Sequence, residues 1–224
     1  EDVVEPTYQT LKAELLDKNI FEPIAIYAYY PCISWDNKIY IFDKKYLYNN
    51  LEEAKKVPPL SEAIKVLEFP RQKRKPFRCI ADFFANDRLD VVGFTLASAG
   101  LKISDYEREF YDRGEFTKYY QVHGLGVELA EALAEVLHKQ IRLDWDIVPK
   151  EGHKLSDVQM KQYVGCRYSP GYAACPELSQ NRDIFDLLNP EKYGIELSET
   201  FQMHPEQTTC AIVVHNKEAN YYNV

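Results

Sequence analysis

Residues 21–30 read FEPIAIYAYY, a run of β-branched and aromatic side chains that predicts a β-strand. Residues 38–42, KIYIF, alternate between the two faces of a sheet and predict a second strand. The polar residues 34–37, SWDN, lie between them. Two strands joined by a short polar turn are typical of a β-hairpin, so this stretch favours an antiparallel sheet.

Four further segments are predicted strands, and they do not follow a regular βαβ order. They cover residues 65–69, 90–97, 195–203 and 208–215. Helical segments separate them irregularly, which is typical of the α+β class. We therefore predict an α+β fold in which residues 1–224 form a single domain, with a bent, mainly antiparallel sheet flanked by helices.

The longest periodic segment predicts one long helix near residues 117–142. Its apolar side chains recur at steps of three and four residues and are expected to face the core: Val122, Leu125, Leu129, Ala132, Leu133, Val136 and Ile141. The remaining side is expected to face solvent and carries Glu128, Glu131, Glu135, His138 and Arg142. Shorter helices are predicted over residues 6–18, 103–111 and 184–188, in the polar stretch 46–56, and from Ser156 with Asp157 in its first turn.

The charge balance excludes several kinds of partner. The net charge is −8 and the pI about 5.2, which argues against a nucleic acid or an anionic membrane. No apolar run approaches the ~20 residues of a membrane helix. The basic run RQKRK at residues 71–75 suggests a phosphate contact or a solvated loop, and we favour the loop.

The five cysteines, Cys32, Cys79, Cys166, Cys175 and Cys210, show no CxxC spacing. An odd number of cysteines without zinc-type pairs fits buried thiols in a reducing cytoplasm. The chain starts at Glu1 rather than at methionine, which suggests a segment of a longer protein or a trimmed chain.

Residues 165–177, GCRYSPGYAACPE, are the first candidate for a binding site. Two prolines and two glycines hold such a segment in one irregular path, and no helical or strand periodicity is visible. Irregular segments between periodic ones are where a ligand can reach bare backbone groups. An ordinary surface loop is the alternative.

Glu131, Glu135 and His138 form a second candidate, because spacings of four and three place them on one helical face. A Glu-x-x-His pair is also found in di-iron bundles, which need a second such pair and two further glutamates. No other histidine has a glutamate three residues before it, so a metal site is the weaker interpretation. The sequence also has no GxGxxG, P-loop or GxSxG motif.

Several motifs in consistent order, from about residue 21 to the end, resemble the activation domain of cobalamin-dependent methionine synthase. Residues 167–177, RYSPGYAACPE, are similar to that family's RPxPGYPxCP(D/E) loop, and LAEALAEVLH at 129–138 to its LAEAxAExLH helix. CIADF at 79–83, LSETFQM at 197–203 and NYYNV at 220–224 resemble its CLADF, LTESxAM and closing KYYAV segments.

The resemblance implies a domain that binds S-adenosylmethionine and reactivates methionine synthase. An electron from a flavodoxin-type donor and the methyl group of S-adenosylmethionine convert cob(II)alamin to methylcobalamin. Cobalamin is expected from a partner domain, because this sequence has no DxHxxG motif. No residue of this chain is expected to be catalytic in its own right, since the chain would position the methyl donor.

The same resemblance implies roles for seven residues. Arg167 is expected to bind the ligand's carboxylate, and Glu131 to face its ammonium or sulfonium. Backbone groups at Ser169 and Gly171 are expected to approach the adenosine. The remaining residues are aromatic: Tyr221 and Tyr222 are expected to contact adenine, and Tyr172 to lie near the methyl-transfer region and the cobalamin.

The chain departs from the family pattern at two positions of the loop. Tyr168 stands where the family has proline, and Leu178 stands where a histidine follows the CP(D/E) motif. An alternative function is a non-catalytic docking module that kept the fold and serves another corrinoid protein.

Overall fold

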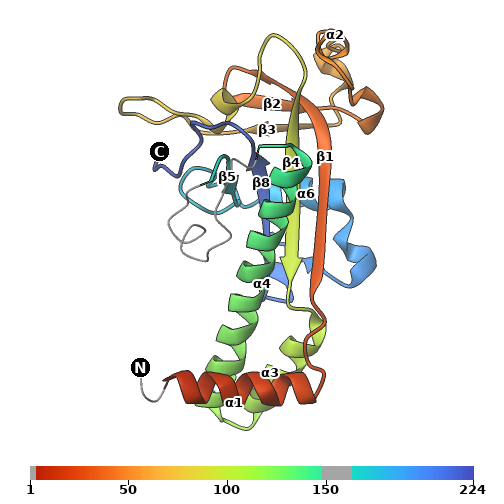
Figure 1. The fold of residues 1–224 in the computed structure, drawn as a ribbon. Helices are drawn as coiled ribbons and strands as arrows, with labels where there is room; N and C mark the ends of the chain where they lie inside the picture. Colours follow the sequence, from red (N-terminus) through yellow and green to blue (C-terminus); the bar gives the residue numbers. More distant parts are fainter. Residues whose placement is uncertain (1–3, 148–162) are drawn as a thin grey trace.

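The computed structural model describes residues 4–147 and 163–224. Its main sheet has six strands in the order β3-β2-β1-β4-β8-β5, and every neighbouring pair is antiparallel. The strands are β1 (Ile24–Trp35), β2 (Lys38–Ile41), β3 (Lys65–Glu68), β4 (Asp90–Ser98), β5 (Cys166–Tyr168) and β8 (Thr208–Val214). In Figure 1, β2 and β3 lie steeply across β4 and β8, so the sheet is bent. The predicted α+β class and bent antiparallel sheet are confirmed.

The predicted hairpin is present and tighter than expected. Trp35 pairs with Lys38, so only Asp36 and Asn37 form the turn. Asp36 has φ 56°, the left-handed conformation that two-residue hairpin turns require at their first position. β1 continues five residues beyond the predicted end at residue 30, because β4 pairs with it as far as Cys32 and β2 pairs with it from Cys32 to Trp35.

The helices are α1 (Val4–Asp17), α2 (Leu51–Ala54), α3 (Leu101–Asp112), α4 (Phe116–Asp144) and α6 (Gln180–Leu188). Short 3-10 turns occupy Lys44–Tyr46, Leu60–Glu62, Ile80–Phe83 and Pro190–Tyr193. The predicted long helix is confirmed as α4, and the helix predicted at 46–56 is reduced to α2. The helix predicted from Ser156, with Asp157, lies outside the described residues.

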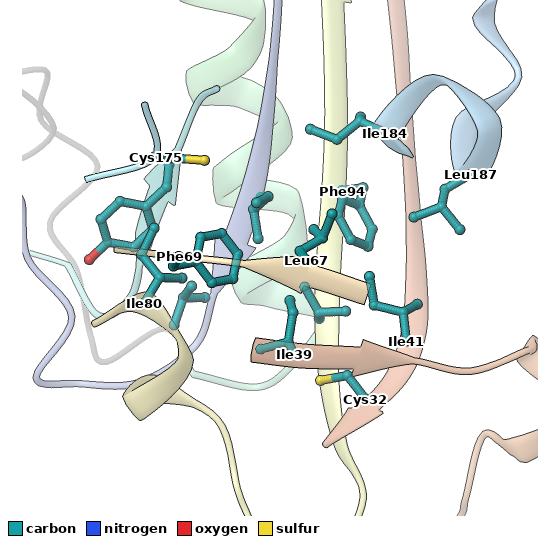
Figure 2. Close-up of a cluster of buried hydrophobic side chains, with 14 of the residues drawn as sticks. Cys32, Ile39, Ile41, Leu67, Phe69, Ile80, Phe94, Cys175, Ile184 and Leu187 are labelled. Carbon is teal, nitrogen blue, oxygen red and sulfur yellow. The ribbon is translucent and has the colours of Figure 1, made fainter. Parts of the chain in front are cut away.

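The sheet has α4 on one face and α6 on the other. Phe94 and Leu96 of β4 belong to the main core together with Ile184 and Phe185 of α6. Ala97 packs instead against Ala134 and Leu137 of α4. Neighbouring residues of a strand point to opposite faces, which explains this division. Figure 2 shows Ile184 and Leu187 pointing toward Phe94 and Leu67 across the main core.

The predicted core face of α4 is wrong at Ala132 and Val136, whereas Ile141 is buried as predicted. Val136 is 63% exposed and Ala132 is exposed, whereas His138 and Arg142 are buried. The small side chains of Ala130 and Ala134 are buried as well. His138 and Arg142 are covered by the ring of Tyr163, which makes an edge contact with His138 and lies 4.1 Å from the Arg142 guanidinium. Periodicity alone cannot reveal this, because the cover comes from a distant segment.

Two other segments differ from their prediction. Residues 195–203 were expected to form one strand, but they contain β6 (Glu196–Leu197), a turn, and the start of β7 (Met203–His204). Phe201 has φ 63°, and the backbone N–H of Gln202 donates to Ser198 Oγ, so the chain reverses there. Conversely, residues 166–168 of the loop expected to be irregular form β5, which pairs with β8.

Helices α1, α3 and α4 are joined by a polar cluster around Glu14. Glu14 accepts hydrogen bonds from Lys118 Nζ and, at 2.5 Å, from the Tyr106 hydroxyl. The bond from Lys118 and then that from Tyr106 lower the pKa of Glu14 from 4.5 to about 2. A carboxylate with a lowered pKa stabilises the fold above its unfolded pKa, and this contribution is lost as the pH falls toward 2.

We expect Glu14→Gln to lower the free energy of unfolding by about 1 kcal/mol at pH 7, because the 27% exposed side chain is partly screened by water. The difference from the unchanged protein should shrink between pH 4.5 and pH 2, where the carboxylate takes up a proton. Urea unfolding at pH 7 and at pH 3 measures both effects. Glu128→Gln, at an exposed position of α4, is the control. An equal loss at both pH values would contradict the role of the Glu14 charge.

Candidate functional site

A cavity of about 500 Å³ lies at the β5 edge of the sheet. Its wall comes from α4, β5, the loop that follows β5, and the C-terminal residues. This volume is within the ~300–1,000 Å³ typical of small-molecule sites. Six of the seven predicted site residues line it: Glu131, Arg167, Ser169, Tyr172, Tyr221 and Tyr222. The seventh, Gly171, lies in the same loop, next to Tyr172.

Arg167 is held between β5 and α4. Its backbone pairs with Val213 of β8, and its Nη2 donates to Oε1 of Glu135 on α4. The Arg167 side chain is only 11% exposed, although it lines the cavity. Its Nε and the Oε2 of Glu135 are buried, and neither has a hydrogen-bond partner among the described residues. The guanidinium therefore keeps a donor, at Nε, that no described neighbour uses.

The loop after β5 is fixed by its own backbone. The N–H of Gly171 donates to the carbonyl of Cys175 at 2.8 Å, and the N–H of Cys175 donates to the carbonyl of Tyr172 at 2.9 Å. Gly171 has φ 92°, which side chains other than glycine's rarely allow. A Cβ at this position would also lie 3.2 Å from Cδ1 of Leu178. This tight loop presents Ser169 and Tyr172 to the cavity.

A cluster of aromatic side chains forms another part of the cavity wall. Tyr168 stacks on Phe83 with ring centroids 6.2 Å apart, and it meets Tyr221 and Tyr222 edge-on. Its hydroxyl donates to the carbonyl of Asn220 at 2.7 Å. Tyr168, the residue that departs from the family pattern, thus anchors the C-terminal segment against the core.

Tyr222 and Tyr172 both line the cavity but differ in their exposure to solvent. The Tyr222 hydroxyl is buried and has no hydrogen-bond partner in the described part of the chain. Burial raises the pKa of Tyr222, so its hydroxyl stays protonated and can donate. Tyr172 is 71% exposed at the rim of the cavity. Tyr222 therefore has a buried hydroxyl without a described partner, whereas the ring of Tyr172 is open to solvent.

The weaker metal hypothesis finds no support in the geometry. Glu131 is exposed, whereas His138 is fully buried. Burial, followed by the nearby charges of Arg142 and Arg167, lowers the pKa of His138 to about 2. Within residues 4–147 and 163–224, no group of three or more His, Cys, Asp or Glu side chains is arranged to hold a metal ion. All five cysteines are buried free thiols.

Sequence reasoning missed some features of the cavity. Thr209 and Asn223 also line it, and nothing in the local sequence pattern marks them. The pair of Glu135 and Arg167 was missed as well, since Glu135 was considered as a metal ligand, a solvated residue or a carboxylate facing a cationic ligand, and not as a partner of Arg167. Its spacing of four from Glu131 placed it on the right face of the helix, but its partner lies 32 residues away.

In the described part of the chain, no helix combines the length and apolar character needed to cross a membrane. The basic run at 71–75 is exposed, as expected of a solvated loop, and Arg71 forms a two-bond ion pair with Asp82 at 2.6 and 2.7 Å.

Comparison with known proteins identifies the family. Residues 3–224 match the family described as "Vitamin B12 dependent methionine synthase, activation domain". The methionine synthases of Mycobacterium tuberculosis and Mycobacterium leprae are 37% and 36% identical over 212 residues. These matches cover 89% of this chain and only 17% of each relative.

A solved structure has the same fold. It is described as the MetH reactivation domain bound to AdoHcy, and it superposes with a TM-score of 0.85 at 24% identity. The match covers 97% of this chain and 66% of the other. With the family match over nearly the whole sequence, it follows that this chain belongs to the activation-domain family of vitamin B12-dependent methionine synthase.

Proposed function

We propose that this chain binds S-adenosylmethionine in the β5 cavity and supports the reductive methylation of cob(II)alamin to methylcobalamin. The observation that carries the proposal is the nearly buried guanidinium of Arg167, which lines a cavity with aromatic walls and whose Nε has no described partner. An amino-acid carboxylate is the group that a guanidinium binds best. The structural neighbour, described as bound to AdoHcy, supports a ligand of this class.

Each wall of the cavity fits one part of the ligand. Arg167 would bind the carboxylate, and Glu131 would face the ammonium or the sulfonium. Backbone groups at Ser169 and Gly171 would lie against the adenosine, where glycine allows close approach. Tyr221 and the buried hydroxyl of Tyr222 would contact the adenine.

The reaction needs positioning rather than a protein nucleophile. Cobalamin held by another domain would supply the metal that takes the methyl group, and a flavodoxin-type donor would supply one electron. The carbon–sulfur bond of S-adenosylmethionine would break and leave S-adenosylhomocysteine. This chain would hold the sulfonium end toward the rim, where the exposed Tyr172 lies. Fixing two reactants in a reactive orientation is itself a large part of catalysis.

The chain spans 17% of the length of the mycobacterial methionine synthases, so whole-enzyme activity belongs to a larger assembly. We infer that residues 1–224 act as one activation domain of such a methyltransferase and dock on its cobalamin-binding domain. The flavodoxin-type electron donor is the second expected partner. Five reduced, buried cysteines fit a cytoplasmic location.

Titration calorimetry with S-adenosylmethionine tests the proposal. We expect Arg167→Lys and Arg167→Ala to weaken binding about 10- to 100-fold, because a charge-assisted bidentate contact is lost. Arg167→Lys keeps the positive charge beside Glu135. A loss of affinity in this variant therefore reports the missing guanidinium geometry and not an unpaired carboxylate. Arg108→Ala, an exposed arginine of α3, is the control.

The same titration distinguishes the S-adenosylmethionine site from the alternative of a docking module. No heat at millimolar ligand, with Arg167→Ala indistinguishable from the unchanged protein, would exclude the S-adenosylmethionine site and leave the docking module. Binding that persists at full strength in both Arg167 variants would place the ligand elsewhere.

Tyr222→Phe gives a second and independent test. Its hydroxyl is buried without a described partner, so removing it should leave the thermal stability of the ligand-free protein unchanged or slightly raised. Affinity for S-adenosylmethionine should fall about five- to tenfold if the hydroxyl donates to the ligand. Thermal unfolding with and without ligand measures both quantities. A loss of stability without ligand would show that the hydroxyl serves the fold instead.

A further inference from the structure

Glu135 is in contact with the residue on which the proposed site depends, although it does not line the cavity. It lies one helical turn after Glu131 on α4, and its Oε1 accepts a hydrogen bond from Nη2 of Arg167. Among the described residues, Glu135 is thus a carboxylate that balances the charge of this nearly buried guanidinium.

The contact between the two side chains is incomplete. Oε2 of Glu135 and Nε of Arg167 are both buried, and neither has a described partner. A carboxylate and a guanidinium that match each other form two parallel bonds. Here only the bond from Nη2 to Oε1 is made, while Nε and Oε2 stay unpaired. The interaction between the two side chains is therefore weaker than that of a pair with two bonds.

The choice of nitrogen matters for any incoming carboxylate. A guanidinium can bind a carboxylate through two parallel bonds on its side edge, with Nε and Nη2, or on its end edge, with Nη1 and Nη2. Both edges include Nη2, the atom that Glu135 already contacts. Nη2 has two N–H groups, one on each edge. A ligand carboxylate that binds Arg167 bidentately therefore lies next to Glu135 on the same nitrogen and close to its negative charge, which repels the ligand carboxylate.

We infer that Glu135 is an internal competitor of the ligand carboxylate for Arg167. This inference rests on the proposed function and adds a regulation to the same site. Glu135 neutralises the guanidinium when the cavity is empty, lowers the affinity for any ligand with a carboxylate, and re-forms its bond as the ligand leaves. It acts through Arg167 and is a specificity-determining residue, since a ligand without a carboxylate does not meet the competition.

Glu135→Gln isolates the charge, because the amide oxygen still accepts the bond from Nη2 while the negative charge is gone. We expect S-adenosylhomocysteine to bind roughly three- to tenfold more tightly to this variant, since a partly exposed ion pair competes only modestly. Methylthioadenosine, which has the adenosine and thioether but no amino-acid end, should bind equally to both proteins. Titration calorimetry with the two ligands measures the difference.

Two variants make the test specific. Glu128→Gln removes one negative charge from an exposed position of the same helix and should change neither affinity. In an Arg167→Ala background, Glu135→Gln should no longer tighten S-adenosylhomocysteine binding, because the shared partner is missing. Equal methylthioadenosine binding by all variants shows that the cavity is intact in each of them.

The possible failures are distinguishable. Weaker S-adenosylhomocysteine binding in Glu135→Gln would mean that Glu135 orients Arg167, and unchanged binding would mean that the two carboxylates do not compete; either result overturns the inference and leaves the proposed function in place. If neither ligand binds the unchanged protein, the proposed function and the inference that rests on it both fail.

Discussion

The antiparallel pairing of β5 with β8 is the constraint on which the cavity depends. Three pairs, Cys166 with Val214, Arg167 with Val213 and Tyr168 with Ile212, place this short strand at the end of the sheet. Cys166 and Tyr168 join the main core, so the intervening Arg167 points to the opposite face, where α4 carries Glu135. A shift of one residue would bury the guanidinium in the apolar core and remove it from the cavity.

Local sequence patterns predicted the parts of the fold that local forces decide. The hairpin of β1 and β2, the central β4, the strand β8 and the long helix α4 all follow from periodicity and turn residues. The errors lie where distant segments decide. Residues 166–168 form a strand because β8 offers an unpaired edge, and His138 and Arg142 are buried because Tyr163 covers them.

The candidate site shows the same division. Arg167, Ser169 and Tyr172 come from one loop, and their proximity is evident from sequence. Glu131 and the two terminal tyrosines come from segments far apart in the chain, and only the resemblance to a family connected them with the loop. The structure brings them to one cavity, while their binding roles stay predictions. Two contacts, from Glu135 to Arg167 and from Tyr168 to Asn220, were not predictable, because each joins residues more than 30 positions apart.

The charges around the cavity bear on the ligand-binding role that we propose for the Arg167 guanidinium. His138 lies near Arg167 and Arg142, yet its burial keeps it neutral, with a pKa of about 2. Protonation of His138 would add a positive charge that would draw Glu135 and any ligand carboxylate away from Arg167. His138 is neutral and Glu135 makes one bond to Arg167. The charge of the guanidinium is therefore balanced, while its Nε donor remains without a described partner. Under the proposed function, a ligand with its own carboxylate and a positive end would be held between Arg167 and Glu131, whereas a simple anion would meet two glutamates.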